Sequence, residues 1–599
     1  MLSRDALRPQ FSDEQAQRYS SELYGIEGVA SELPSERDQN FKITTSSGEI
    51  YVLKIAAESE NVEILKLQNQ AMARLQEQLK KGRSPAIVPS TSGREIESLK
   101  APDGRKHFVR MFTYLEGRVL AEVNPHTDDV LTGLGRFVGG ISKALDGWSH
   151  AAADRQFHWD IYQAEAVIQN HLGHISEQSE RDLVEYYLGM FKDNILPKKD
   201  RLRSSILHND ANDHNVVVRS PHVSEECSFG ILDFGDMVAS STVFEVAIAA
   251  AYTMLGKSDP LRAAARVIAG YHSVHSLQEE EFEVLFAAIC TRLVMSVVLS
   301  AYQETLEPEN EYLLVSQENA WKLLRDLRNT HPRLALYLFR DACGLEPCPA
   351  SKDVIKWLLK NRRKAKPVLD SLRESEKCTH IDLSTGSPLI PNPDVLADDS
   401  KFLRIIRDTL TEAESEMGFG PYCEARLVYA TDQYRHGDEY RTIHLGVDLF
   451  CPSGTPVFAA FNGVVHSTGD NGLPRDNGPT VVVEHRADNS GLMFYTLYAH
   501  LSSDSLKRVK AGDQVKAGQQ IGEVGASDEN GGWPPHLHLQ LVVDMLGMEG
   551  DFIGVAPPSQ LTTWQSISPD PNLVLGVPED VTTPASLPRE DTLRLRESY

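Results

Sequence analysis

The first 115 residues alternate between short apolar runs and polar turns. Segments 49–56 and 107–115 place apolar residues in alternation or in short runs, as β-strands do. Between them, residues 61–79 repeat apolar positions with the spacing of an amphipathic helix. This pattern predicts a small α+β lobe over residues 21–115.

The stretch that follows is dominated by long apolar-periodic segments such as residues 280–302, which predict a larger helical lobe. Periodicity is then lost where Pro, Ser and Asp become frequent, which indicates a linker. Short strands separated by Gly-rich turns next predict an all-β domain, and the Pro-rich end predicts an extended tail or a linker to a further domain. In chain order we expect an N-terminal segment (1–20), a β-rich lobe (21–115) and a helical lobe (116–370). A linker (371–420), a β-domain (421–565) and a tail (566–599) follow.

Composition narrows the functions of these parts. The 599 residues carry a formal net charge of −25, which disfavours a nucleic-acid surface and a polybasic membrane anchor, because both need clustered Lys and Arg. Seven cysteines, an odd number without a C-x-x-C pair, are typical of reduced thiols. The N-terminus lacks an apolar signal core, and no uninterrupted apolar run is long enough to span a bilayer. We expect a cytoplasmic protein that binds small molecules or proteins, with no nucleic acid and no membrane; a homo-oligomer is left open.

A polar loop within residues 206–218, ILHNDANDHNVVV, lies between two short apolar strands. Transfer of the γ-phosphoryl group of ATP needs a carboxylate that orients the acceptor hydroxyl, ligands for Mg²⁺ and a lysine on the nucleotide phosphates. Asp210 precedes Asn215 by five residues, the H-x-D-x-x-x-x-N spacing of a kinase catalytic loop. The next strand ends in Asp233, and an upstream apolar strand carries Lys54. This order of parts predicts a phosphotransferase.

The other polar residues of the loop have a simpler interpretation. His208, Asn209 and His214 are expected to satisfy backbone groups of the turn. A metal site made of His208 and His214 is the alternative, although the pattern places no third ligand beside them.

These residues together make the sequence resemble the aminoglycoside phosphotransferase family of small-molecule kinases, and within it hydroxylysine kinase-like members, over residues 20–370. The resemblance implies a protein-kinase-like α+β fold with a small β-rich N-lobe and a large helical C-lobe. It also implies ATP or GTP and Mg²⁺ as cofactors and a small-molecule hydroxyl as substrate.

Roles for individual residues follow from the same resemblance. It implies Asp210 as the catalytic base, with Asn215 and Asp233 as magnesium ligands. Lys54 would contact the α- and β-phosphates. The backbone near Phe112 to Leu115, including Thr113, would hold the adenine.

Two features depart from the family pattern. The loop expected over the phosphates, LPSERDQN, lacks glycines, so Ser35 and Arg37 or backbone amides would have to contact phosphate. The helix that normally offers a glutamate to the lysine carries Gln68 at the best position, with Glu63 one turn earlier as a competitor. Lys54 is therefore expected to meet a neutral hydrogen-bond partner.

A second constellation lies in the predicted β-domain. RTIHLGVDLF carries His444 and Asp448, TLYAHLS carries His500, and PPHLHLQL carries His536 and His538. Residues i and i+2 of a strand share a face, so both late histidines can point into one site. Three ligands with additional bases are what a catalytic Zn²⁺ with an open position requires.

The motifs H-x-x-x-D, a lone His and H-x-H resemble the lysostaphin-like M23 metallopeptidases over residues 430–545. The resemblance implies His444, Asp448 and His538 as zinc ligands, and His500 and His536 as bases that orient water and stabilise the oxyanion. A non-hydrolytic zinc-binding or peptide-binding module is the alternative. Three further histidines are expected at the surface: His436, His466 and His485.

A kinase followed by an M23-like domain resembles the front of longer fusion proteins whose third domain is a pyridoxal-phosphate enzyme of the class III aminotransferase fold. The last residues of the chain look like the approach to such a domain, so a pyridoxal-phosphate lyase or aminotransferase is an expected partner. By that analogy the kinase phosphorylates a hydroxylated amino acid or an amino alcohol. A peptidic or aminoglycoside-like acceptor is the alternative.

Overall fold

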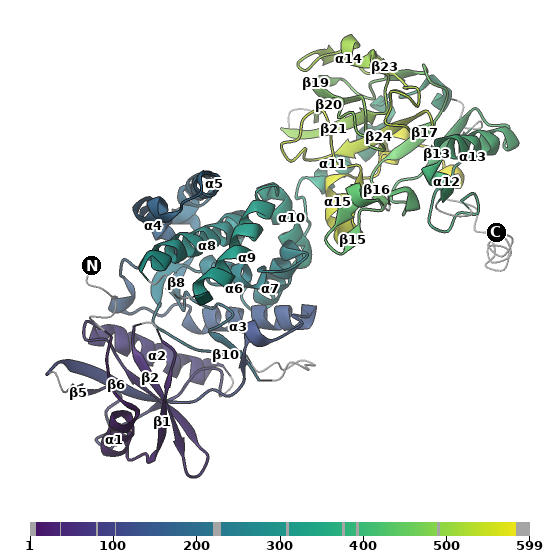
Figure 1. Cartoon of the computed structure of the whole chain (residues 1–599). Helices are drawn as coiled ribbons and strands as arrows, with labels where there is room; N and C mark the ends of the chain where they lie inside the picture. The colour runs from purple at the N-terminus through teal and green to yellow at the C-terminus, as the bar shows by residue number, and fades with distance from the viewer. Residues whose placement is uncertain are drawn as a thin grey trace. The chain divides into compact units, whose positions relative to one another are not determined.

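Two compact units, Met1–Cys343 and Gly344–Tyr599, make up the chain and are described separately (Figure 1). The structure, a computed structural model, describes residues 8–35, 37–79, 82–101, 104–219, 229–306, 311–373, 378–390, 394–429, 431–487 and 491–582.

The N-terminal unit begins with an antiparallel sheet flanked by two helices (Figure 1). Its elements are α1 (Asp13–Tyr24), β1 (Gly28–Leu33), β2 (Gln39–Thr45), β3 (Ile50–Ile55), α2 (Val62–Gln78), β4 (Ile87–Val88), β5 (Glu97–Lys100) and β6 (Lys106–Thr113). The strand order is β1-β2-β3-β6-β4, with β5 also paired to β6. Leu53 and Ile55 of β3 are buried in an apolar cluster with residues of α1. Lys54 alternates with them and therefore leaves the sheet on the opposite face.

The rest of this unit is mainly helical. Its helices are α3 (Asp128–Leu145), α4 (Ala164–His171), α5 (Gln178–Asn194), α6 (Val243–Thr253), α7 (Pro260–Val274), α8 (Glu279–Leu306), α9 (Glu311–Leu327) and α10 (Pro332–Ala342). Helix α8 is central, since α4, α5, α6, α9 and α10 all pack against it. Among the described residues, α8 is the one helix long and apolar enough to cross a membrane by length and composition, and 89% of its apolar window is buried inside the structure.

Short strands between these helices carry the predicted catalytic loop. They are β7 (Arg118–Val119), β8 (Ser204–Leu207), β9 (Val216–Val218), β10 (Phe229–Ile231) and β11 (Val238–Ser241). Strand β8 pairs with β11, while β9 lies between β7 and β10. The two buried strands predicted around the polar loop are thus present as β8 and β9, and they fix both of its ends.

The C-terminal unit is built on an eight-stranded sheet in the order β12-β13-β17-β24-β21-β20-β19-β22. These strands are β12 (Cys378–His380), β13 (Met417–Gly420), β17 (Val447–Phe450), β19 (Gly463–Gly469), β20 (Thr480–Ala487), β21 (Leu492–Ala499), β22 (Gln514–Val515) and β24 (His536–Val542). Two-stranded pairs and short helices surround the sheet. They are α11 (Ser351–Asn361), α12 (Asp394–Ala397), α13 (Asp399–Glu412), β14 (Arg435–His436), β15 (Glu439–Tyr440), β16 (Ile443–His444), β18 (Pro456–Phe458), α14 (Ser505–Arg508), β23 (Gln520–Glu523), β25 (Val555–Ala556), α15 (Leu561–Ile567), α16 (Asn572–Leu575) and α17 (Glu579–Thr582).

The observed boundaries differ from those expected from the sequence. The first unit ends at Cys343, whereas the helical lobe was expected to reach 370, and α11 belongs to the second unit. The expected linker at 371–420 contributes β12 and β13 to the main sheet, because β12 pairs with β13 and β13 with β17. Helix α1 likewise begins inside the expected N-terminal segment. The expected tail contains α16 and α17, and its part beyond 582 lies outside the described residues.

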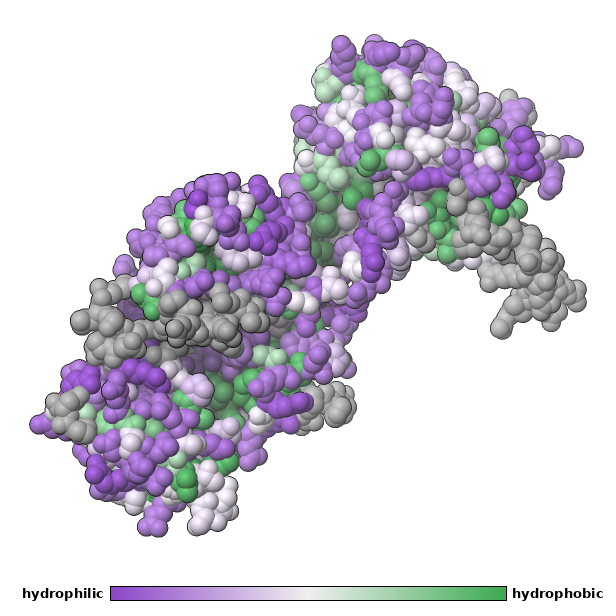
Figure 2. Space-filling view, in the orientation of Figure 1, coloured by the Kyte–Doolittle hydropathy of each residue, from purple (hydrophilic) through white to green (hydrophobic). Residues whose placement is uncertain are grey.

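His485 is a correction to the surface placement expected for it. Its side chain on β20 is buried, with the residue 1% exposed. Nδ1 lies 2.9 Å from the carbonyl oxygen of Asn462, and Nε2 lies 2.8 Å from Thr496 Oγ1. The run of valines around it in β20 is buried on both faces, so alternation with polar residues could not reveal the burial. Over the part of the surface seen in Figure 2, hydrophilic residues predominate among scattered apolar ones, as the net charge of −25 leads one to expect.

Candidate active sites

The polar loop between β8 and β9 brings Asp210 and Asn215 into direct contact. The side-chain nitrogen of Asn215 donates to Asp210 Oδ2 at 2.6 Å and to the carbonyl oxygen of Asp210 at 3.0 Å. Because the nitrogen is used in this way, the amide oxygen of Asn215 is the atom that a cation could take.

Buried groups beneath the loop fix its shape. The N–H groups of His208 and Asn209 donate to Glu245 Oε2 at 2.7 Å and 3.3 Å. His208 Nε2 lies 2.9 Å from the carbonyl oxygen of Leu232, the residue before Asp233. Asn209 and Asp233 have positive φ angles of 68° and 47°, which Asn and Asp tolerate better than most residues. His208 therefore joins the catalytic loop to the strand end that carries Asp233.

Lys54 lies between two carboxylates. Its Nζ is 3.2 Å from Asp38 Oδ2 and 3.5 Å from Asp233 Oδ1. Burial would lower the pKa of Lys54, but the charges of Asp233 and Asp38 outweigh burial and raise that pKa. In return, Lys54 lowers the pKa of Asp233 to about 2. Both groups are thus held in the charged form, which suits a phosphate-binding lysine and a metal-binding carboxylate.

Gln68 does not meet Lys54. It is buried on α2, where its Oε1 accepts a hydrogen bond from Arg110 Nη2 at 2.7 Å. Arg110 is the register partner of Lys54 on the neighbouring strand β6 and also donates to Asn69 Oδ1 at 2.9 Å. Arg110, a second cation beside Lys54, thus binds the side-chain amide of Gln68. Lys54 is paired with the carboxylate of Asp38 instead of the expected neutral group.

The loop expected over the phosphates lies beside this pair. Arg37 Nη2 forms an ion pair with Asp236 Oδ1 at 2.7 Å, and Ser35 Oγ donates to the carbonyl oxygen of Asp38. The charges of Asp236 and Asp233 raise the pKa of Arg37 above the value that burial alone would give. Contact of Ser35 and Arg37 with phosphate stays a prediction.

Thr113 and Leu115 lie at and just beyond the end of β6. The N–H of Ala86 donates to Thr113 Oγ1 at 2.9 Å, and the N–H of Thr113 donates to the carbonyl oxygen of Ala86 at 2.9 Å. Leu115 is buried, and its Cδ1 lies 3.1 Å from where a Cβ on Gly230 of β10 would be. Binding of the nucleotide base to this segment stays a prediction.

A buried cation that no motif indicated contacts Asp210. Arg292 of α8 donates through Nη2 to Asp210 Oδ1 at 2.8 Å and through Nη1 to the carbonyl oxygen of Trp159 at 3.2 Å. Burial raises the pKa of Asp210 to about 7 against the opposing charge of Arg292, and Asp236 and Asp233 raise it further. A carboxylate that titrates near neutral pH suits general base catalysis.

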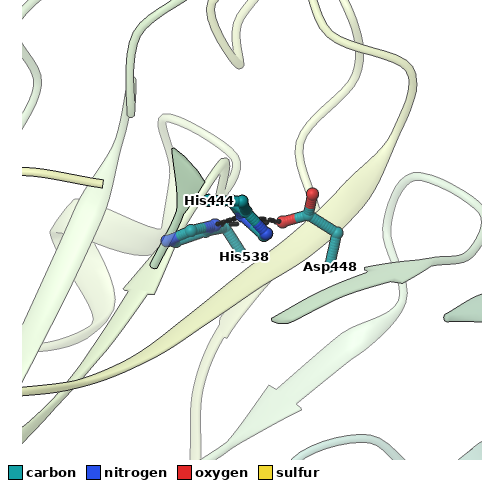
Figure 3. Close-up of side chains that lie close together, drawn as sticks. All are labelled: His444, Asp448 and His538. Carbon is teal, nitrogen blue, oxygen red and sulfur yellow. Dashed lines mark hydrogen bonds and ion pairs between the residues drawn. The ribbon is translucent and has the colours of Figure 1, made fainter. Parts of the chain in front are cut away.

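The second candidate site is centred on β17 and β24, two adjacent strands of the C-terminal sheet. Asp448 of β17 and His538 of β24 are register partners, and His444 ends β16. Figure 3 shows how these side chains converge. His538 Nδ1 and His444 Nε2 lie 2.9 Å and 3.2 Å from Asp448 Oδ1, and the two nitrogens are 3.0 Å apart. We call these three buried residues the M23 ligand group.

The donor atoms of the M23 ligand group fit zinc. Bonds of about 2.0–2.1 Å in a tetrahedron put neighbouring ligand atoms about 3.3 Å apart. The outer nitrogens are also occupied, His444 Nδ1 at 3.1 Å from the carbonyl oxygen of Pro421 and His538 Nε2 at 3.3 Å from Gln540 Oε1. Such outer hydrogen bonds are typical of metal-binding histidines. Burial lowers the pKa of His444 to about 4, which keeps it in the neutral form that binds metal.

Gly446, within the H-x-x-x-D motif, leaves room for His538. A Cβ at this position would lie 2.3 Å from His538 Cε1, 2.6 Å from its Nε2 and 2.8 Å from the carbonyl oxygen of Leu539. Any side chain here would displace a predicted zinc ligand.

His500 and His536 lie beside the M23 ligand group. Their Nδ1 atoms lie 3.1 Å and 2.7 Å from the carbonyl oxygens of Asn530 and Pro534, so each Nε2 keeps its lone pair. His536 Nε2 is 3.6 Å from Asp448 Oδ1. The ring centroids of His500 and His536 are 4.4 Å apart. Burial lowers the pKa of both imidazoles. The structure brings all five predicted residues together, and the roles of these two as bases stay a prediction.

A buried arginine behind Asp448 joins it to a glutamate. Arg426 Nη1 lies 2.5 Å from Asp448 Oδ2, and its Nε lies 2.7 Å from Glu424 Oε2. The pKa of Asp448 falls well below its ordinary value, because His444 and Arg426 outweigh the effect of burial. Burial raises the pKa of Glu424 to about 7.

A cavity of about 310 Å³ opens onto the M23 ligand group. Its lining includes Asp448 and His538, two of the predicted zinc ligands, and both candidate bases. Aromatic and cationic side chains complete the wall, among them Phe402, Tyr434, Arg441, Arg475 and Trp533. This volume lies at the lower end of the range for small-molecule sites.

Comparisons with known proteins bear on the family of each unit. Residues 29–282 match the Phosphotransferase enzyme family. The chain is 33% identical to the hydroxylysine kinase of Mus musculus over 348 residues, which are 54% of this chain and 91% of that relative. It is 32% identical to the hydroxylysine kinase of Bos taurus over 347 residues, which are 53% of this chain and 90% of that relative. The chain belongs to the phosphotransferase enzyme family. A solved structure of a microcompartment-associated aminopropanol kinase is 16% identical, covers 55% of this chain and 98% of its own, and has a TM-score of 0.40.

Residues 442–548 match Peptidase family M23. The peptidoglycan DD-endopeptidase ShyC of Vibrio cholerae is 38% identical over 101 residues, covering 17% of this chain and 20% of that relative. This phosphotransferase therefore carries a C-terminal M23 peptidase domain, and both family predictions are confirmed. The chain is an enzyme with a small-molecule phosphotransferase part and a peptidase-family part. The kinase-like fold of the N-terminal unit implies ATP and a divalent metal ion as cofactors. Peptidases of family M23 are zinc-dependent.

Six charged residues of these sites were not predicted from the sequence, because no spacing motif assigns them a role. They are Asp38, Arg110, Glu245, Arg292, Glu424 and Arg426. One signal was available: Arg292 interrupts the apolar run AAICTRLVMSVV, and a cation inside a buried helix needs an anionic partner.

Proposed function

We propose that the N-terminal unit transfers the γ-phosphoryl group of ATP to the hydroxyl of a small amine-bearing metabolite. The contact of Asp210 with Asn215, together with the pairing of Lys54 with Asp233, is the observation that supports this proposal. Asp210 accepts the hydroxyl proton while the acceptor oxygen bonds to the γ-phosphorus and the bond to the β-phosphate oxygen breaks. Asn215 and Asp233 would hold Mg²⁺, and Lys54 would hold the phosphates.

A hydroxylated amino acid or an amino alcohol is the proposed acceptor. Hydroxylysine kinases from several vertebrates match this chain over about nine-tenths of their length, which supports that class. GTP as donor and a peptidic or aminoglycoside-like acceptor are the alternatives. A pyridoxal-phosphate lyase that eliminates the new phosphate group is the proposed partner, and the cytoplasm the proposed compartment.

For the C-terminal unit we propose a zinc-dependent peptidase or amidase. The M23 ligand group would hold zinc, which supplies a water of lowered pKa. The unprotonated Nε2 of either His500 or His536 would accept a proton from the attacking water, and an imidazole protonated in this way would donate to the oxyanion. The cavity beside them suits a small peptide or amide. A binding module that does not hydrolyse is the alternative.

Nucleotide consumption tests the kinase proposal. Wild type and Asp210→Asn are compared on hydroxylated amino acids, amino alcohols, aminoglycosides and short peptides, with ATP and with GTP. We expect one acceptor class to be phosphorylated and the Asp210→Asn rate to fall at least about 100-fold, the usual contribution of a general base, with nucleotide binding kept. Asp213→Asn, in the same loop, is the matched control. Full activity of Asp210→Asn would refute the assignment of the base.

Product analysis tests the hydrolase proposal separately. The full chain is loaded with Zn²⁺ and incubated with a library of dipeptides and N-acyl amides. We expect wild type to cleave a member of the library and His444→Ala to cleave none. In wild type, cleavage should stop when zinc is removed and return when zinc is restored. Zinc binding without any cleavage in this library would favour the binding module.

A further inference from the structure

A second cluster of side chains that could hold a metal ion lies in the C-terminal unit. His380 ends β12, Asp382 follows it, and Glu424 comes shortly after β13. One ligand atom from each residue lies within 4.8 Å of the others. These positions lie outside 29–282 and 442–548, so neither family match accounts for them.

His380 is oriented as metal-binding histidines are. Its Nδ1 lies 3.0 Å from the carbonyl oxygen of Val581, which can only accept, so Nδ1 carries the proton and Nε2 keeps its lone pair. Nε2 is buried and meets no hydrogen-bond partner among the described residues. A buried acceptor without a donor is costly, and a cation would remove that cost. His444 of the M23 ligand group has the same arrangement, with Nδ1 on the carbonyl oxygen of Pro421.

The two carboxylates of this cluster are held in place by backbone groups. The N–H of Ser384 donates to Asp382 Oδ1 at 2.9 Å, and the N–H of Leu383 donates to Glu424 Oε1 at 3.1 Å. These hydrogen bonds orient the carboxylates but bring no full positive charge. Each carboxylate keeps further lone pairs for a cation.

The positive charge next to Glu424 is shared. Arg426 pairs through Nε with Glu424 and through Nη1 with Asp448, so one guanidinium charge is shared by two carboxylates. Asp382 adds a further negative charge beside Glu424. A divalent ion bound by Asp382 and Glu424, and another in the M23 ligand group, would compensate this excess of buried negative charge.

We propose that His380, Asp382 and Glu424 form a second site for a divalent transition-metal ion, zinc or manganese, separate from the M23 ligand group. One imidazole nitrogen and two carboxylate oxygens are ligands that both ions accept. Through His380 and its bond to Val581, the ion links β12 and α17. Through Glu424 it holds Arg426 against Asp448, so it positions a metal ligand and takes no part in bond cleavage.

Metal content of the full chain tests this site. Protein is saturated with Zn²⁺, freed of unbound ion by gel filtration, and analysed for zinc per chain; a parallel series uses Mn²⁺. We expect His380→Ala to hold one zinc fewer than wild type, His444→Ala also one fewer, and the double variant two fewer. His466→Ala, which removes a partly exposed histidine of the same unit, should hold as much as wild type. If His380→Ala holds the wild-type amount, the proposal is wrong.

A spectroscopic measurement covers the case in which His380→Ala fails to fold. Cobalt(II) is added to zinc-free His444→Ala protein, in which the M23 ligand group is broken and β12 is untouched. Visible absorption of a bound cobalt ion, lost in His444→Ala combined with the nearly isosteric Asp382→Asn, is expected. Absence of that absorption in His444→Ala would overturn the proposal. Neither readout depends on phosphotransfer or hydrolysis, so failure of those activities leaves this test intact.

Discussion

Arg292 Nη2 lies 2.8 Å from Asp210 Oδ1, and the arginine side chain is 1% exposed. The proposed base is therefore paired with a fixed, buried cation on α8. Asp210 also experiences the negative charges of Asp233 and Asp236, which favour its protonated form. The arginine opposes them, so the ionised base at neutral pH depends on a residue outside the catalytic loop.

Arg292→Gln should move the pH profile of phosphotransfer. A base must be ionised to act, so activity rises with pH through the pKa of Asp210. Removal of the cation that lowers this pKa moves the rising limb of the profile to higher pH. Once the limb lies above pH 7, activity at pH 7 falls about tenfold for each further pH unit that the limb moves. The measurement is kcat/KM against pH.

Arg292→Lys is the matched variant, because it keeps the charge and should keep the limb near its wild-type position. Loss of one partner of a buried ion pair costs about 3–5 kcal/mol, so the thermal midpoint of each variant is measured alongside. A limb that stays in place in folded Arg292→Gln would show that this arginine only supports the fold.

Asp38 and Gln68 provide a test of which residue holds Lys54. Asp38→Asn removes a carboxylate 3.2 Å from Lys54 Nζ, and we expect KM for ATP to rise about tenfold, the value of one charged hydrogen bond. Gln68→Leu should leave KM for ATP within about twofold and reduce stability, because Gln68 bonds Arg110. Steady-state kinetics at varied ATP separate the two. The opposite ranking would restore the partner expected from the sequence.

Elements whose spacing is local could be predicted from the sequence. Asp210 and Asn215 lie in one loop, and the motif alone brings them together, as the hydrogen bond between them shows. Asp38 and Lys54 are adjacent only because β2 and β3 pair in a particular register. Arg292 reaches Asp210 across 82 positions, so only the packing of α8 reveals it.

The same limit explains the expected linker at 371–420. Its low periodicity is genuine, but β12 and β13 are short and pair at the edge of a sheet whose other strands lie far along the chain. Segments of three or four residues carry too few alternating positions to be recognised. Within the M23 ligand group, His444 and Asp448 are close in sequence around Gly446, whereas His538 lies 90 positions from Asp448 and was expected beside them from the resemblance to the M23 family.

Gly446→Ala should weaken zinc binding without removing any ligand. The new Cβ would lie 2.3 Å from His538 Cε1, so the ring must move away from Asp448. Displacement of a ligand or of its outer hydrogen bond commonly costs about 10–100-fold in metal affinity. Competition with a chromophoric chelator measures this change. Gly189→Ala, where a Cβ meets no atom within 4 Å, should bind zinc as wild type does. Unchanged affinity in Gly446→Ala would mean that His538 does not bind the ion.

His485 should make the C-terminal unit less stable in acid. Burial lowers its pKa from 6.5 to about 4, so between these values the unfolded chain binds a proton that the folded unit excludes. The contribution of neutral His485 to the free energy of unfolding is fully present above pH 6.5 and is lost as pH falls from 6.5 toward 4. At pH 5 this loss is about 2 kcal/mol. His485→Gln cannot titrate and should lose about 2 kcal/mol less than wild type between pH 7.5 and pH 5. Hydrogen exchange of β20 and β21 peptides in the full chain measures this difference, with His466→Gln expected to follow wild type. Equal acid sensitivity of His485→Gln and wild type would place the titrating group elsewhere.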